Sequence, residues 1–197
     1  MKFFDNVQPR GHLEVWKHFP DGTKELHFSD DNVICSGMGA TLAEMMDAAP
    51  ATPVTLFQIP YFKVGTSGHS DLQVSTTGDV SGALTETMYG ADGNLDLSEH
   101  SLWRNGVEET DNMFGVIPTS YIKRVSDTKC MYQIVLDEQT ANVGDETVPR
   151  YLDEIGLYSR NPYNLSTEAS LLVAYRYFKS VYKTDAFILV FRWIIEF

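Results

Sequence analysis

The stretch Phe187-Ile-Leu-Val-Phe-Arg-Trp-Ile-Ile-Glu-Phe197 decides the fold class, because it alternates almost without a break. Large apolar side chains occupy every second position: Phe187, Leu189, Phe191, Trp193, Ile195 and Phe197. A period of two is typical of a β-strand with one face in the core. We therefore predict a strand with a buried, paired C-terminus. A strand this apolar would promote aggregation at an open edge, so a neighbouring strand or subunit is expected to cover it.

The nearest candidate neighbour is the apolar run 171–178. The segment 180–185 between the two runs is polar, although it contains no Asn-Gly or Asp-Gly pair. A polar connection between two apolar runs indicates a hairpin. We predict that the runs pair with one another.

Other short strands are expected along the chain. Residues 13–16 and 24–28 flank the turn pair Asp21-Gly22, which predicts a first hairpin. The apolar run 55–64 contains Pro60, which favours an edge strand or two short strands. The remaining expected strands are 121–125, 131–136 and 152–158.

One helix and one long loop complete the expected organisation. Thr41-Leu-Ala-Glu44 matches a capping box, so a short helix should open there and end before Pro50. Residues 69–115 are rich in Ser, Thr, Gly, Asp and Asn, which predicts a long irregular loop or insertion. We expect one domain over residues 1–197. Its predicted class is mainly β, an antiparallel β-sandwich with one short helix and that loop.

Composition narrows the classes of partner. The chain has 197 residues, 43% of them apolar, and a formal net charge of −12. Its 15 Lys and Arg residues are scattered, which argues against a direct role in nucleic-acid binding. No window approaches the roughly 18 apolar residues of a membrane helix, and the start lacks a signal-peptide core. We expect no membrane partner and no secretion by the ordinary route.

The two cysteines, Cys35 and Cys130, lack CxxC spacing. This pattern fits free thiols in a reducing compartment, with a single disulfide between them as the alternative.

The sequence lacks the common motifs of catalysis and metal binding. Asp92-Gly-Asn-Leu-Asp96 opens like a calcium loop, but Leu97 stands where that loop requires Gly. The five histidines do not fall at metal-ligand spacing, and neither a P-loop nor a GxSxG elbow occurs. We expect no enzymatic activity, no cofactor and no metal.

The aromatic residues allow two interpretations. A sugar-binding face could be built from Tyr151, Tyr158, Tyr163, Tyr175, Tyr177, Tyr182 and Trp193. Packing in the core or at a subunit interface is the commoner use of such side chains and is favoured.

Three parts of the chain together resemble virion structural proteins of tailed bacteriophages. The first is Asp31-Asn-Val-Ile34 with the small residues leading to Leu42, and the second is Ile59-Pro-Tyr-Phe-Lys-Val-Gly-Thr-Ser-Gly68. The third and strongest comprises Asp153–Tyr158, Leu172–Phe178, Lys183–Asp185 and Val190–Phe197. This ending is also similar to the attachment domains of tail-collar fibre proteins.

The resemblance implies a β-sandwich without catalytic residues that assembles with copies of itself and with other virion proteins. It implies a location in the virion after synthesis in the host cytoplasm. The expected function is a neck or collar connector, or a fibre-attachment protein, forming a symmetric multimer. Alternatives are a capsid decoration or baseplate protein and, from other classes, a carbohydrate-binding module or a hydrolase in the acidic loops. Candidate subunit-interface residues are Tyr175, Tyr177, Phe191, Trp193 and Phe197.

Overall fold

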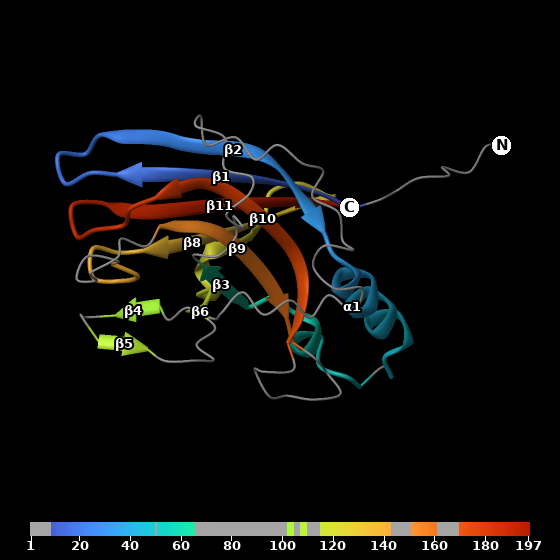
Figure 1. Cartoon of the computed structure of the whole chain (residues 1–197). Helices are drawn as coiled ribbons and strands as arrows, with labels where there is room; N and C mark the ends of the chain where they lie inside the picture. Colours follow the sequence, from blue (N-terminus) through green and yellow to red (C-terminus); the bar gives the residue numbers. More distant parts are fainter. Residues whose placement is uncertain are drawn as a thin grey trace, which may run out of the picture.

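The computed structural model describes residues 9–49, 51–65, 102–104, 107–109, 115–142, 151–160 and 170–197. Nine strands form one antiparallel sheet in the order β6-β3-β9-β10-β2-β1-β11-β8-β7 (Figure 1). They are β1 (Arg10–His18), β2 (Lys24–Ile34), β3 (Tyr61–Gly65), β6 (Gly115–Val116), β7 (Ile122–Arg124), β8 (Lys129–Leu136), β9 (Leu152–Ser159), β10 (Leu171–Val181) and β11 (Ile188–Glu196). The other elements are α1 (Ser36–Asp47), the 3-10 turns η1 (Val54–Phe57) and η3 (Thr119–Tyr121), and the separate hairpin β4 (Leu102–Arg104) with β5 (Val107–Glu109).

The predicted mainly β, antiparallel fold with one short helix is confirmed. In place of the two separate sheets of a β-sandwich, the main strands form one sheet curled into a half-barrel, and β2 joins its two halves. Residues 24–32 of β2 pair with β1, whereas Val33 and Ile34 pair with β10. Strand β2 therefore belongs to both halves and makes the sheet continuous between them.

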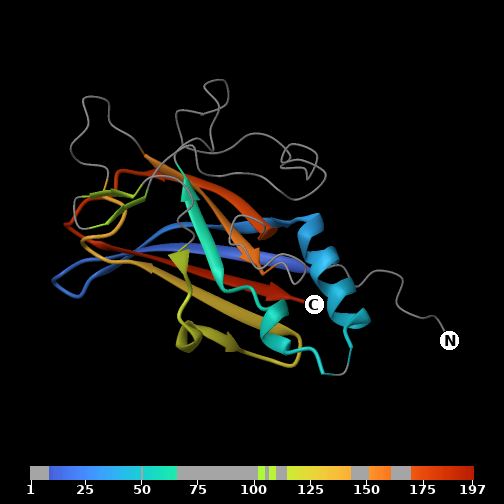
Figure 2. The same cartoon turned by 90° about the horizontal axis from the view of Figure 1, so that it is seen from below.

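The sheet curls strongly around the core. Phe178 of β10 and Phe191 of β11 have ring centroids 5.4 Å apart, although three strand intervals separate the two strands in the sheet. In a flat sheet that separation would be about 14 Å. The contact therefore requires the inner faces of the two halves to meet. Figure 2 shows the curl, with α1 at the end where the C-terminus lies.

The predicted terminal hairpin is wrong. Strand β10 pairs with β9 and β2, while β11 pairs with β1 and β8. The β1–β2 hairpin lies between them, so they meet through side chains across the core instead of through backbone hydrogen bonds.

The predicted core face of the last strand is largely confirmed. The four side chains Leu189, Phe191, Trp193 and Ile195 are completely buried. Phe197 differs, because its side chain is 39% exposed while its backbone N–H donates to the Thr128 carbonyl at 2.9 Å. The C-terminus is thus paired but not buried.

The helix starts earlier than the capping-box pattern predicts. It begins at Ser36 after Cys35, and Thr41 lies inside it with its Oγ1 donating to the Gly37 carbonyl at 2.8 Å. Gly37 permits close packing on β10, since a Cβ there would lie 2.2 Å from the backbone oxygen of Leu172. Gly37 therefore lies inside the helix and serves its contact with the sheet.

The other expected strands are present with adjusted bounds. The first hairpin forms around Gly22, whose φ of +85° is the left-handed conformation that glycine adopts readily. The run with Pro60 becomes η1 followed by the single strand β3, which pairs with both β9 and β6, so the expectation of an edge strand or two short strands is wrong. Pro60 lies before β3 and does not interrupt its pairing.

Most of the predicted loop 69–115 lies outside the described residues. Its described part includes the hairpin β4–β5, where the sequence predicts irregular chain. Cys35 and Cys130 are not joined by a disulfide, and Cys35 is buried while Cys130 is half-buried.

Candidate functional site

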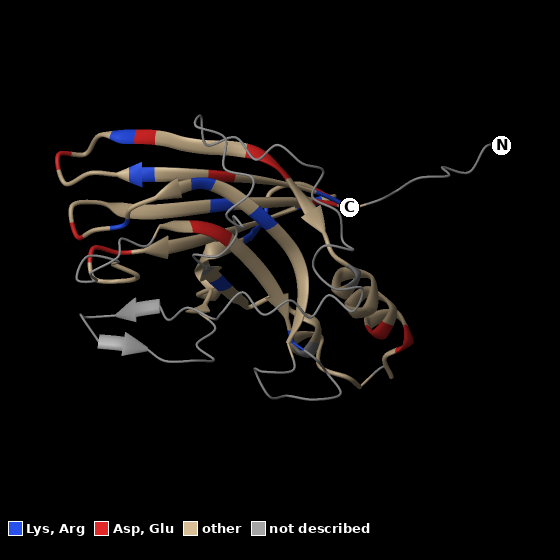
Figure 3. Cartoon of the chain, in the orientation of Figure 1, with Lys and Arg blue, Asp and Glu red and all other residues tan. Residues whose placement is uncertain are grey.

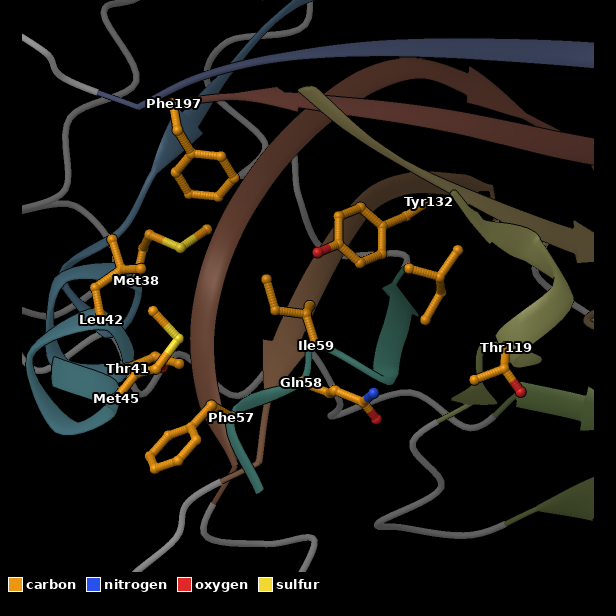
Figure 4. Close-up of a pocket in the computed structure, with 11 residues that line it drawn as sticks. Met38, Thr41, Leu42, Met45, Phe57, Gln58, Ile59, Thr119, Tyr132 and Phe197 are labelled. Carbon is orange, nitrogen blue, oxygen red and sulfur yellow. The ribbon is translucent and has the colours of Figure 1, made fainter. Parts of the chain in front are cut away.

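An apolar pocket of about 490 Å³ lies between α1 and the end of the curled sheet (Figure 4). This volume is within the range of binding sites for small molecules and side chains. Six residues from four parts of the chain carry most of its wall: Met38, Leu42, Met45, Phe57, Tyr132 and Phe197.

One face of α1 forms the apolar wall. Met38, Thr41, Leu42 and Met45 stand at helical spacing and all line the pocket. The Thr41 hydroxyl is engaged with the Gly37 carbonyl and with Ser159 Oγ, at 2.7 Å from the latter. Because its one hydroxyl is already hydrogen-bonded within the protein, this wall presents an apolar surface to the pocket.

The opposite wall supplies the polar groups. Tyr132 is buried, and burial, followed by the neighbouring Cys130 thiol, raises the pKa of its phenol. The ring therefore stays neutral over the physiological pH range. Gln58 and Thr119 add an amide and a hydroxyl, and none of the described residues that line the pocket is charged.

Exposed apolar side chains lie on the elements that surround the pocket. Met45 is 45% exposed and Met46 is 85% exposed on α1, while Val54 of η1 is 73% exposed. Tyr121 and Phe197 are also exposed. Apolar side chains gathered around a pocket indicate an interaction site, because isolated exposed apolar residues are ordinary but grouped ones are not.

The candidate interface residues are placed differently from the prediction. Tyr175, Phe191 and Trp193 are completely buried inside the single chain, so their side chains are inaccessible to a second subunit. Tyr177 is half-buried and packs edge-on against Tyr175, with centroids 5.0 Å apart. Only Phe197 is both exposed and part of the pocket. The alternation that marks β11 identified a core face, and for these three residues the interface prediction is corrected.

The sequence did not predict the pocket. Its walls come from α1, from η1 and the two residues after it, from η3, β7 and β8, and from Phe197. The helical spacing of Met38, Leu42 and Met45 was the one local signal. That spacing could not say which segments lie opposite.

Ser29, His12 and Asp31 make the hydrogen bonds of a catalytic triad on the β1–β2 hairpin. His12 Nε2 lies 2.9 Å from Ser29 Oγ, and His12 Nδ1 lies 3.0 Å from Asp31 Oδ1. The strand register produces this contact, since His12 is directly opposite Asp31. The Asp31 side chain is 88% exposed, so water screens its charge, whereas a triad uses a buried carboxylate. We interpret the cluster as a surface polar ladder.

Lys183 is buried and fully hydrogen-bonded. Its Nζ donates to Asp137 O at 2.9 Å, Asn142 Oδ1 at 3.0 Å and Thr184 O at 2.7 Å. Burial lowers its pKa to about 8, and the carboxylates of Asp137, Glu138 and Asp185 partly offset that effect. Because all three N–H groups are used, the ammonium group joins two loops and is not a free nucleophile.

The part of the chain that the structure describes contains no group of three or more His, Cys, Asp or Glu residues arranged to hold a metal ion. No described helix is both long and apolar enough to cross a membrane. The Asp92–Asp96 segment lies outside the described residues.

Comparison with protein-family models, with curated proteins and with solved structures gives no match.

Proposed function

We propose that this protein is a non-enzymatic structural component of a tailed-bacteriophage virion. The favoured role is a neck or collar connector, or a fibre-attachment protein, that forms a symmetric multimer. The resemblance of Asp153–Tyr158, Leu172–Phe178 and Val190–Phe197 to such proteins supports the virion assignment. A capsid decoration or baseplate role is the alternative position.

The apolar pocket and its exposed surroundings are the observation that carries the assembly role. A protein that works by docking needs an accessible apolar surface, and Met46, Val54 and Phe197 provide one beside the pocket. The described polar clusters do not supply an enzyme site, because Lys183 is fully bonded and Asp31 is solvated.

The charge distribution also favours a protein partner over nucleic acid. Lys and Arg are spread over several of the described strands, some of which also carry Asp or Glu, and they do not form one continuous basic stripe (Figure 3). Phosphate binding requires several basic groups on one face.

Mass spectrometry on purified particles, with copy-number estimation, tests the virion assignment. A low multiple such as six or twelve per particle supports a neck or fibre-attachment position, and hundreds of copies would move the protein to the capsid surface. Absence from particles would overturn the proposal.

A fluorophosphonate probe tests the non-enzymatic part. Such probes label activated serines covalently. We expect no adduct on Ser29 after prolonged incubation. A stoichiometric adduct that His12→Ala abolishes would show that the surface ladder is a catalytic triad after all.

A carbohydrate-binding module is the second candidate, and one observation favours it. Tyr151 and Tyr182 are both exposed, with ring centroids 5.6 Å apart. Tyr158 and Tyr175 are buried, so they cannot grip a sugar, and Tyr163 lies outside the described residues. Glycan-array binding that Tyr182→Ala removes would support this function, and silence of the array with intact protein would exclude it.

A further inference from the structure

The pocket lies where the chain joins the sheet. Strand β1 begins at Arg10, which pairs with Glu196 at the end of β11. The next residue, Phe197, lines the pocket. The part of the chain that precedes β1 is therefore attached at the pocket end of the sheet.

The sequence of that preceding part suits the pocket chemically. Residues 1–8 read Met-Lys-Phe-Phe-Asp-Asn-Val-Gln and include the adjacent aromatic residues Phe3 and Phe4. Met38 and Met45 line the pocket, and thioether side chains pack favourably against aromatic rings. The wall is uncharged, which fits an aromatic side chain better than a charged one.

The strand directions place the start of β1 beside the pocket, with the strand running away from it. Strands β1 and β11 are antiparallel, so β11 ends at the pocket and β1 runs away from it. A straight extension of β1 beyond Arg10 would continue past Glu196, the last paired residue of β11, and so past the end of its own sheet. The six residue-to-residue steps from Pro9 back to Phe3 can span about 20 Å when extended, which is enough to reach a neighbouring subunit.

We infer that Phe3 and Phe4 of one copy occupy the pocket of a second copy. This inference rests on the proposed multimer and names the contact that builds it. Exchange of a terminal segment between identical subunits is a common route to symmetric assembly. The contact explains why an apolar pocket with exposed methionines stands open in the single chain.

The first experiment measures self-association of the full chain by analytical ultracentrifugation over a range of concentrations. Phe3→Ser/Phe4→Ser and the pocket variant Met45→Glu should each weaken association at least about tenfold, because each removes apolar burial at the contact. Both changes fall at positions that should leave folding intact, since Met45 is 45% exposed and residues 3 and 4 precede the first strand. Leu26→Glu is the matched control. Leu26 is 47% exposed, like Met45, but it lies near the start of β2, whereas β2 leads into α1 and the pocket at its other end.

The second experiment distinguishes exchange between copies from docking within one copy. Phe4→Cys and Met45→Cys are prepared as separate proteins in a Cys130→Ser background, mixed, and oxidised mildly. We expect a covalent dimer containing one chain of each variant. The pair Phe4→Cys with Leu26→Cys should not cross-link. Closure within a single chain carrying both Phe4→Cys and Met45→Cys, without dimers in the mixture, would overturn the exchange.

The outcomes separate this inference from the proposed function. A multimer that is insensitive to the Phe3→Ser/Phe4→Ser and Met45→Glu changes overturns the inference and leaves the structural role standing. A wild-type chain that stays monomeric at all concentrations also overturns the inference, even if the protein is present in particles. Absence from particles would instead overturn the function.

Discussion

Gly11→Ala should destabilise the fold because Gly11 makes room for the Asn32 side chain. A Cβ at Gly11 would lie 1.9 Å from Asn32 Oδ1, and its three nearest atoms all belong to that side chain. Asn32 Oδ1 accepts from Trp193 Nε1 at 2.7 Å, and Asn32 Nδ2 donates to the Val33 carbonyl at 3.0 Å. The substitution must therefore push Asn32 away and leave the buried indole N–H without this acceptor.

The expected cost follows from that lost partner. An unsatisfied buried donor costs about 1–3 kcal/mol. Replacing Gly by Ala in a strand offsets roughly 0.5–1 kcal/mol of that, because the unfolded chain loses freedom. We expect Gly11→Ala to lower the free energy of unfolding by about 1–2 kcal/mol.

The same substitution should change sign when Asn32 is absent. In an Asn32→Ala background there is no side chain to displace, so Gly11→Ala should be neutral or stabilise by roughly 0.5 kcal/mol. Trp193→Phe should also remove much of the cost, since its ring has no N–H to satisfy.

Urea unfolding of the four proteins in the cycle measures this coupling, with equal slopes as the check on a common unfolded state. An equal cost of Gly11→Ala in both backgrounds would refute the reasoning. So would a neutral effect in the wild-type chain.

Three further predictions concern the core, the helix and the buried lysine. Lys183→Met should lower the free energy of unfolding by about 2–4 kcal/mol near pH 7, because it strands three hydrogen-bond acceptors. The pKa of Lys183 is about 8 in the folded protein and 10.5 in the unfolded chain, so the unfolded chain binds more protons between pH 8 and pH 10.5. The free energy of unfolding of the wild type should therefore rise with pH in this range, by up to about 3 kcal/mol relative to Lys183→Met. Urea titrations in which the two proteins show parallel pH curves would contradict this. Gly37→Ala should destabilise the protein by at least about 2 kcal/mol, because the added Cβ would clash with the backbone oxygen of Leu172. Gly39→Ala should stabilise it by up to about 1 kcal/mol, because a Cβ there has nothing within 4 Å. Thermal melts in which both variants shift the melting temperature in the same direction would exclude the packing argument. Phe178→Ala should cost about 3–5 kcal/mol by chemical denaturation, since its buried ring links the two halves of the sheet, and a cost below about 1 kcal/mol would mean that the halves do not depend on it.

Two residues in the segments that the sequence analysis singled out have structural roles. Asn32 holds Trp193 across the intervening strand β1, and Lys183 joins two loops through its three hydrogen bonds. Both residues belong to the segments that resemble phage virion proteins.

The candidate site was less predictable than the fold. The sequence singled out five aromatic interface residues, yet three of them fill the core. Aromatic alternation indicates burial but not whether the burying surface belongs to the same chain. Phe197 is exposed, unlike these three residues, because it follows the last residue of β11, Glu196.

By itself, the sequence determined the properties that depend on neighbouring residues. The alternation of the last eleven residues predicted a strand and its core face, and Asp21-Gly22 predicted a hairpin turn, because side-chain direction and backbone conformation are local. Only the tertiary structure decided which strands pair. An apolar face can be buried whichever strands lie beside it, so the alternation could not reveal that β11 lies between β1 and β8. The pocket has the same origin, because α1, Tyr132 and Phe197 meet only when the sheet curls.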